Sequence, residues 1–311
     1  METTSKLTGH QLSVAKTILF TIACIAIFIV IAIICEPLTA WIRINSLKVS
    51  IREVFLRMPL TILALHFFAK KVIKTYDPAV IYGKLVFVSM MKWIAIAFIL
   101  PITVGMFYYL FGFMAPFPHT VSLNAADKIN LFIKWTAISI AAGLTEEVLF
   151  RGHLFMIIGN RCSKVQAILI TSLIFGLVHI AMLTSFGLLD IFIVVVGGVI
   201  AGIMFSLVCQ YTKGIWYAAI VHIIWDVFFI GKITTLATTQ ADANQTIMAF
   251  KLTTHNLLLA GGNFGMEAGA PCLVIYLVVA AVLYRKIYNG TKQTLVIADK
   301  NVPLSFNKSV L

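Results

Sequence analysis

Two adjacent glutamates followed by an arginine stand inside an apolar stretch of this chain. Glu146, Glu147 and Arg151 belong to the text Ala-Ala-Gly-Leu-Thr-Glu-Glu-Val-Leu-Phe-Arg. An ionisable residue at the centre of a bilayer costs roughly 2.5–3.5 kcal/mol, whereas an apolar one returns only about 0.3–0.6 kcal/mol. If the stretch crosses a membrane, these side chains need partners or a watery cavity. Ionisable residues placed in this way are usually functional, and carboxylates can serve as general bases.

Helix geometry separates the roles of the two glutamates. Glu147 and Arg151 are four residues apart, so a helix places them on one face in the favourable order for an ion pair. Glu146 is rotated by ~100° from Glu147 around the helix axis, and we expect it to face the neighbouring helices. The spacing therefore predicts a structural pair at Glu147 and Arg151, with Glu146 left for chemistry.

Two further apolar segments carry imidazoles. His179 ends the run Phe-Gly-Leu-Val-His, and His222 and Asp226 lie four apart in His-Ile-Ile-Trp-Asp. Each signal alone is equally typical of a hydrogen bond between helices. Acids and imidazoles on three separate apolar segments together predict one site. His153, by contrast, is expected at a span end, in an interfacial position.

Composition identifies the class of protein. Of the 311 residues, 60% are hydrophobic and only 12% are charged, whereas a soluble domain carries about 25% charged residues. The net charge of +12 comes from cations that cluster between apolar segments. The positive-inside rule and anionic lipid headgroups account for such clusters, so we expect contact with membrane lipids and no nucleic-acid partner.

The apolar segments predict an all-α fold, a polytopic transmembrane bundle of seven or eight spanning helices. Seven stretches approach the length needed to span the hydrocarbon core: Thr17–Cys35, Leu85–Met114, Lys134–Ile158, Val165–Leu183, Ile191–Thr212, Ile215–Gly231 and Ala270–Tyr284. The weaker stretch Val54–Ala69 is either an eighth span or an interfacial helix. Pro116–Asn130 and Thr234–Glu267 are predicted to be loops.

Three parts follow from this pattern. Residues 1–130 hold the N-terminal membrane helices and their loops, residues 131–232 form a helical core that carries all the candidate site residues, and residues 233–311 hold an outward loop, the last span and a cytoplasmic tail. Arg161 and Lys164 precede one span, while Arg285 and Lys286 follow the last one. Placing these cations in the cytoplasm makes the C-terminus cytoplasmic.

The motif order resembles that of the CPBP family of intramembrane endopeptidases. Glu-Glu-x-x-x-Arg, then Phe-x-x-x-His, then His-x-x-x-Asn/Asp is similar to the signature of that family, over roughly Trp135 to Ile230. The family includes the CAAX prenyl protease and bacterial relatives linked to bacteriocin processing or immunity. The resemblance implies a helical bundle with a buried catalytic cavity.

The resemblance also implies roles for the motif residues. Glu146 would activate water with His179 holding it, as in a glutamic peptidase, while His222 and residue 226 would stabilise the oxyanion. Position 226 is Asp here, whereas Asn is more usual in the family. Because a carboxyl donates a hydrogen bond only when protonated, Asp226 has the alternative role of orienting His222.

Cofactor and partner expectations follow. A glutamate-activated water needs no metal, so no cofactor is expected; the alternative is a zinc ion on Glu146, His179 and His222. The expected partner is a peptide or protein substrate, lipidated and membrane-embedded ones included. Two other functions remain open: a non-proteolytic immunity or binding protein that keeps the fold, and a proton-coupled transporter.

Overall fold

Long helices dominate the protein. The computed structural model describes residues 11–120, 122–183, 186–229, 234–236, 240–254 and 256–300, and the predicted helical class is confirmed there. Five helical stretches among them are long and apolar enough to cross a membrane. They are α1 (Val14–Leu38), α4 (Phe87–Leu110), Lys164–Met182, α8 (Leu188–Thr212) and the first part of α12, Ala270–Asn289. The expected total of seven or eight spans stays a prediction.

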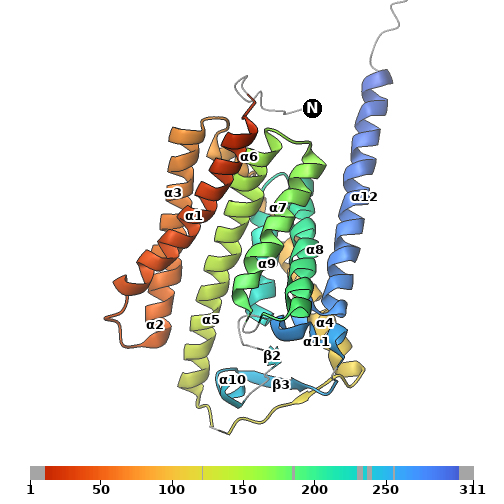
Figure 1. The fold of residues 1–311 in the computed structure, drawn as a ribbon. Helices are drawn as coiled ribbons and strands as arrows, with labels where there is room; N and C mark the ends of the chain where they lie inside the picture. Colours follow the sequence, from red (N-terminus) through yellow and green to blue (C-terminus); the bar gives the residue numbers. More distant parts are fainter. Residues whose placement is uncertain are drawn as a thin grey trace, which may run out of the picture.

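Two other helical runs change their winding along their length. One consists of α2 (Asn45–Ser50), the π-helical η1 (Ile51–Arg57), α3 (Met58–Phe68) and η2 (Ala69–Ile73). It contains the stretch Val54–Ala69 and packs beside α1 (Figure 1). The other consists of α5 (Ala125–Glu146), the π-helical η4 (Glu147–Leu154) and α6 (Phe155–Gly159), and it carries both glutamates.

Capping boxes begin the helices that lead to the candidate site. The Asn124 side chain accepts from the backbone N–H of Asp127, whose carboxylate accepts from the backbone N–H of Asn124 at the start of α5. Ser163 and Gln166 make the same reciprocal pair at the start of α7 (Lys164–Val178). Each box satisfies backbone donors that a helix start leaves without partners.

Glycines bring α7 against α8. A Cβ atom on Gly176 would lie 2.5 Å from the carbonyl oxygen of Val195, and one on Gly198 would lie 2.6 Å from the Cα atom of Gly176. No side chain fits in either place, so the two backbones approach closely, as small residues allow between membrane helices. His179 follows three residues after Gly176 and is therefore fixed relative to α8.

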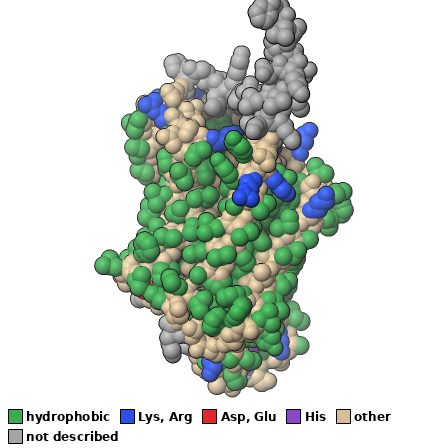
Figure 2. Space-filling view, turned by 90° about the vertical axis from the view of Figure 1, so that its right-hand side faces the viewer, with side chains coloured by type: hydrophobic (Ala, Val, Ile, Leu, Met, Phe, Trp, Pro, Cys, Tyr) green, Lys and Arg blue, Asp and Glu red, His purple; other side chains and the backbone are tan. Residues whose placement is uncertain are grey.

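The lateral surface is apolar. Large hydrophobic side chains such as Ile18, Phe87, Leu173 and Val278 are exposed on the outer faces of α1, α4, α7 and α12. Figure 2 shows hydrophobic side chains over most of one face, with Lys and Arg gathered toward its ends. A soluble protein seldom exposes so large an apolar patch, so this surface indicates an integral membrane protein.

A small sheet at one end of the bundle corrects the two predicted loops (Figure 1). β1 (Met114–Pro116) pairs antiparallel with β3 (Met248–Leu252), which pairs in parallel with β2 (Thr234–Leu236). The short α10 (Gln240–Asn244) lies in the same region. Pro116–Asn130 and Thr234–Glu267 are therefore not wholly irregular. Strands this short have no detectable periodicity, and only tertiary pairing forms them.

Candidate active site

Glu147 and Arg151 form a buried ion pair in the π-helical part of the run. An Nη1 donor of Arg151 lies 2.9 Å from Oε1 of Glu147, and the two side chains are 2% and 0% exposed. The pairing at four residues agrees with the expectation from the sequence. The local helix type differs from that expectation, because a π-helix replaces the expected α-helix. Such wide turns occur mostly as short insertions and frequently at functional sites.

Two other helices enclose the guanidinium of Arg151. Its Nη2 donates to the carbonyl of Gly202 in α8 at 3.3 Å. Its central carbon lies 4.2 Å from the ring centroid of Phe175 in α7 and 5.2 Å from that of Phe205 in α8. The aromatic faces attract the cation when water is excluded. The ion pair thus ties η4 to α7 and α8.

His222 is oriented by Glu147. It lies in α9 (Trp216–Phe229), and its Nδ1–H donates to Oε1 of Glu147 at 2.9 Å. Its ring stacks on Phe205 with centroids 4.6 Å apart. Asp226 makes no direct hydrogen bond to this ring, since its Oδ1 lies 3.7 Å from Nε2 of His222, and its role stays a prediction. The structure assigns this orienting contact to the neighbouring glutamate, which the sequence indicated only as a partner of arginine.

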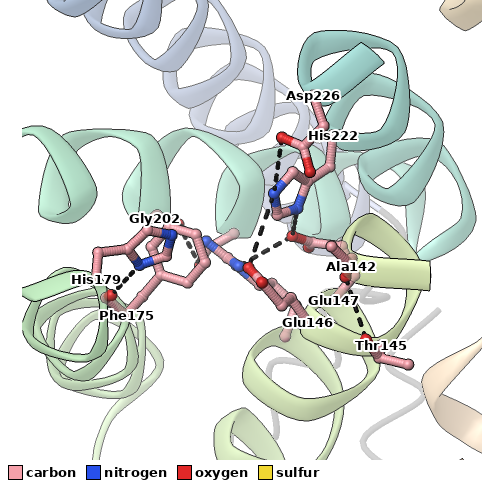
Figure 3. Close-up of polar contacts among 11 residues, drawn as sticks. Ala142, Thr145, Glu146, Glu147, Phe175, His179, Gly202, His222 and Asp226 are labelled. Atoms are coloured by element: carbon pink, nitrogen blue, oxygen red, sulfur yellow. Dashed lines mark hydrogen bonds and ion pairs between the residues drawn. The ribbon is translucent and has the colours of Figure 1, made fainter. Parts of the chain in front are cut away.

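The other ring nitrogen of His222 faces Glu146 and Asp226. Its Nε2 lies 3.8 Å from Oε2 of Glu146 and 3.7 Å from Oδ1 of Asp226 (Figure 3). The Glu146 side chain is 20% exposed, whereas that of Glu147 is fully buried. The two glutamates therefore face different surroundings, as the rotation of ~100° between successive helix residues predicts.

His179 approaches from a third element. It is the first residue of η5 (His179–Met182), and its Nδ1–H donates to the carbonyl of Phe175 at 2.7 Å. This bond fixes the tautomer, and Nε2 of the half-buried ring has no hydrogen-bond partner among the described residues. Figure 3 shows His179 and His222 on separate helices, with the two glutamates on another.

A cavity of about 260 Å³ joins these groups. Four of the predicted site residues line it: Glu146, His179, His222 and Asp226. Two charged residues that the sequence analysis did not single out for the site also line it, Arg57 from η1 and Glu267. Arg57 donates to Glu53 at 2.9 Å. Glu267 had one signal in the sequence, since it is the only acid between Gly261 and the last span.

The donor set does not fit a metal ion as it stands. Within the described residues, no group of three or more His, Cys, Asp and Glu side chains is arranged to hold one. The Nδ1 atoms of His179 and His222 donate to Phe175 and Glu147, which is compatible with ligation through Nε2, so it is the spacing of the donor groups that does not fit an ion. We therefore derive no step through zinc.

His153 corrects another expectation. Its side chain is fully buried instead of interfacial, and its Nδ1 hydrogen-bonds the hydroxyl of Tyr76 at 2.7 Å. The ring also packs edge-on against His66 in α3, with centroids 5.2 Å apart. The run α2–η2 covers this part of η4, which a reading of isolated spans could not anticipate.

Comparison with known proteins gives a family match that spans the candidate site. The family described as type II CAAX prenyl endopeptidase Rce1-like matches residues 128–228. The match supports the resemblance to the CPBP/CAAX protease family over about a third of the chain. The matched segment contains all six predicted site residues, and the match indicates a membrane protease of the hydrolase class. No curated protein and no solved structure matches the chain.

Proposed function

We propose that the protein is an intramembrane endopeptidase that hydrolyses a peptide bond at or in the membrane. Glu146 takes a proton from a water molecule that His179 helps to hold, and the resulting hydroxide attacks the scissile carbonyl. His222 and Asp226 donate hydrogen bonds to the oxyanion. One observation carries the proposal: a carboxylate and an imidazole nitrogen lie 3.8 Å apart on one cavity. Positioned bases and donors of this kind are what peptide hydrolysis requires.

The contacts of His222 support its role at the oxyanion. The Nδ1 atom of His222 carries a proton, because it donates to Glu147. Nε2 can therefore donate a hydrogen bond only when the ring is doubly protonated. The Glu147 carboxylate faces the positive charge of that form of the ring. Arg151 and the ring of Phe205 hold that assembly in one geometry. Donors fixed before the reaction begins stabilise developing charge without reorganisation.

The family description supports the substrate class. The name type II CAAX prenyl endopeptidase suggests a peptide presented at the membrane, lipidated near its cleavage site. The non-lipidated alternative is a leader-type peptide. Both belong in the assay, because apolar helices alone do not distinguish them.

The test uses the purified full chain in lipid nanodiscs. Farnesylated peptides ending in Cys-a-a-X and non-lipidated leader-type peptides are incubated with wild type and with Glu146→Gln, and the products are identified by mass spectrometry. We expect the substitution to lower turnover by about 10²–10⁴-fold, the range of a lost general base. Glu36→Gln is the matched control, since Glu36 lies 59% exposed at the end of α1 and pairs with Lys48 and Arg52. Full turnover by Glu146→Gln would overturn the assignment.

A chelator added to the same cleavage assay tests the alternative of a zinc-dependent mechanism. The proposal expects unchanged turnover after treatment with 1,10-phenanthroline. Activity that is lost and then restored by zinc would replace the metal-free mechanism. Binding without cleavage of any peptide by wild type would favour the immunity or binding alternative, and proton-coupled solute uptake would favour transport.

We place the C-terminus in the cytoplasm. Gln11 contacts Arg161 near the beginning of α7, and the end of α12 lies at this same end of the bundle (Figure 1). Arg161, Lys164, Arg285 and Lys286 therefore share one side, which the positive-inside rule assigns to the cytoplasm. A C-terminal reporter that is active only in the cytoplasm tests this orientation, and an inactive reporter would reverse it.

A further inference from the structure

A third carboxyl group faces the cavity from outside the segment that matches the family. Glu267 lies in η7 (Met266–Ala268), just before α12, and the family match ends at residue 228. It lines the same cavity as Glu146, His222 and Asp226. The three sequence motifs do not include it, and hydrolysis by Glu146 and His179 does not use it.

Tertiary contacts hold the segment that delivers Glu267. At the start of α8, the Asp190 carboxylate accepts from the backbone N–H and the side-chain amide of Asn263, at 2.9 and 2.7 Å. The hydroxyl of Tyr108 in α4 donates to the carbonyl of Leu259 at 2.5 Å. A Cβ atom on Gly197 would lie 3.2 Å from that of Ala268, so η7 packs directly on α8. The carboxyl group is therefore positioned by α4 and α8 and does not depend on its own short helix alone.

The surroundings of the Glu267 carboxyl are unusual for a structural acid. Its Oε1 is shielded from solvent and has no hydrogen-bond partner among the described residues. Buried polar groups normally have partners, so this atom calls for a functional explanation. The titratable and charged side chains that line the cavity with it are Arg57 and Glu146 (η1 and α5), His179 (η5), His222 and Asp226 (α9), and Tyr276 (α12), and the Cys272 thiol of α12 interacts with it as well.

Burial sets the protonation of this carboxyl. Removal from water raises the pKa of Glu267 to about 8; the Asp226 and Glu146 carboxylates raise it too, and His222 opposes them. The group therefore holds a proton at neutral pH and releases it as the pH rises above about 8. An acid with a pKa near the working pH is well suited to proton donation in a transition state.

Peptide hydrolysis needs such a donor. The amine leaves the tetrahedral intermediate only when its nitrogen gains a proton, because an amide anion is too basic to be expelled. Glu146 is the base, because it removes a proton from water. With a second carboxyl group in the cavity as the acid, the two roles are divided between two carboxyl groups. Pairs of acids in different environments carry such divided roles in other hydrolases.

We propose that Glu267 is the general acid that protonates the leaving nitrogen. This role rests on the proposed function. Water adds to the carbonyl carbon as Glu146 accepts its proton, and the Glu267 carboxyl gives its own proton to the nitrogen as the C–N bond breaks. The proton on Glu146 then passes to the Glu267 carboxylate through solvent in the cavity. Both groups return to their starting states, and the net reaction consumes one water and yields one acid and one amine.

A pair of substrates tests the assignment. One is a peptide that wild type cleaves, and the other is the same sequence with sulfur in place of the scissile N–H group. A thiol with a pKa of about 8.5 leaves as thiolate and needs no proton. We expect Glu267→Gln to lose about 10²–10⁴-fold in kcat on the amide and to stay within about tenfold of wild type on the thioester, which needs no general acid. Glu146→Gln should lose activity on both, because both reactions need the activated water.

The pH profile gives a second measurement. Wild-type kcat on the amide should fall more steeply above pH about 8, where Glu267 loses its proton, than kcat on the thioester after subtraction of spontaneous hydrolysis, because the titration of the oxyanion donors affects both substrates alike. An equal loss of both substrates in Glu267→Gln would make the residue structural and overturn the proposal, and so would no loss on the amide. If wild type cleaves neither substrate, or Glu146→Gln keeps both, the proposed function fails instead.

Discussion

Glu147 and His222 are joined by a hydrogen bond of 2.9 Å between Oε1 and Nδ1, and the same oxygen accepts from Arg151. One buried carboxylate oxygen therefore accepts hydrogen bonds from donors on two helices. The residue regarded from the sequence as half of a structural pair also aims the imidazole at the cavity. Stability and catalysis should for that reason change together at this position.

Glu147→Gln tests that coupling. Removing one partner of a buried ion pair typically costs about 3–5 kcal/mol, because a charge stays buried without compensation. We expect a lower thermal midpoint of unfolding in detergent and a loss of peptide cleavage in the fraction that stays folded. Glu36→Gln, at an exposed pair, should change neither. A midpoint for Glu147→Gln equal to that of this control would contradict the structural role.

Two substitutions of Asp226 should have opposite effects on peptide cleavage. Asp226→Asn supplies an amide that donates at every pH, so cleavage should persist and depend less on pH. Asp226→Ala removes the donor, and its kcat should fall by about 10²–10³-fold, as for a lost oxyanion-hole donor. Initial rates from pH 5 to 9 measure both effects. Inactive Asp226→Asn would mean that the residue must carry charge and does not act as a donor.

His179→Ala should affect catalysis much more than stability. The ring is half-buried, and its only hydrogen bond among the described residues goes to the Phe175 carbonyl of its own helical segment. We expect kcat to drop by about 10²–10⁴-fold with little change in the unfolding midpoint. His119 is a matched control, because it is also half-buried and bonds a backbone carbonyl, that of Thr246, at 2.8 Å. Equal rates for His179→Ala and His119→Ala would remove His179 from the mechanism.

Gly176→Ala probes the close approach of α7 and α8. An added methyl group would lie 2.5 Å from the Val195 carbonyl oxygen, so the helices must separate. Overpacking of this kind typically costs about 1–3 kcal/mol, and the separation should also lower cleavage by moving His179. Gly105→Ala in α4 meets nothing within 4 Å and should be neutral or stabilising, since alanine favours the helix by up to about 1 kcal/mol. A Gly176→Ala protein as stable and active as Gly105→Ala would show that this contact is not needed.

Local composition was enough to predict much of the architecture. The apolar stretches around α1, α4, α7, α8 and α12 needed only length and hydropathy, because the bilayer requires about 20 apolar residues per span. The ion pair of Glu147 and Arg151 followed from helical spacing, which is a property of neighbouring residues. The motif residues likewise stood out because charge is rare in such segments.

Contacts between distant residues needed the tertiary structure. The hydrogen bond from His222 to Glu147, the burial of His153 under α3, and the pairing of β1 with β3 each join segments far apart in sequence. No periodicity encodes them, since a helix pattern shows which residues share a face but not which helix that face meets. Glu267 is the clearest case. Its sequence context indicated a loop, and only the packing of η7 on α8 brings its carboxyl group to the cavity, where low polarity and neighbouring carboxylates keep it protonated.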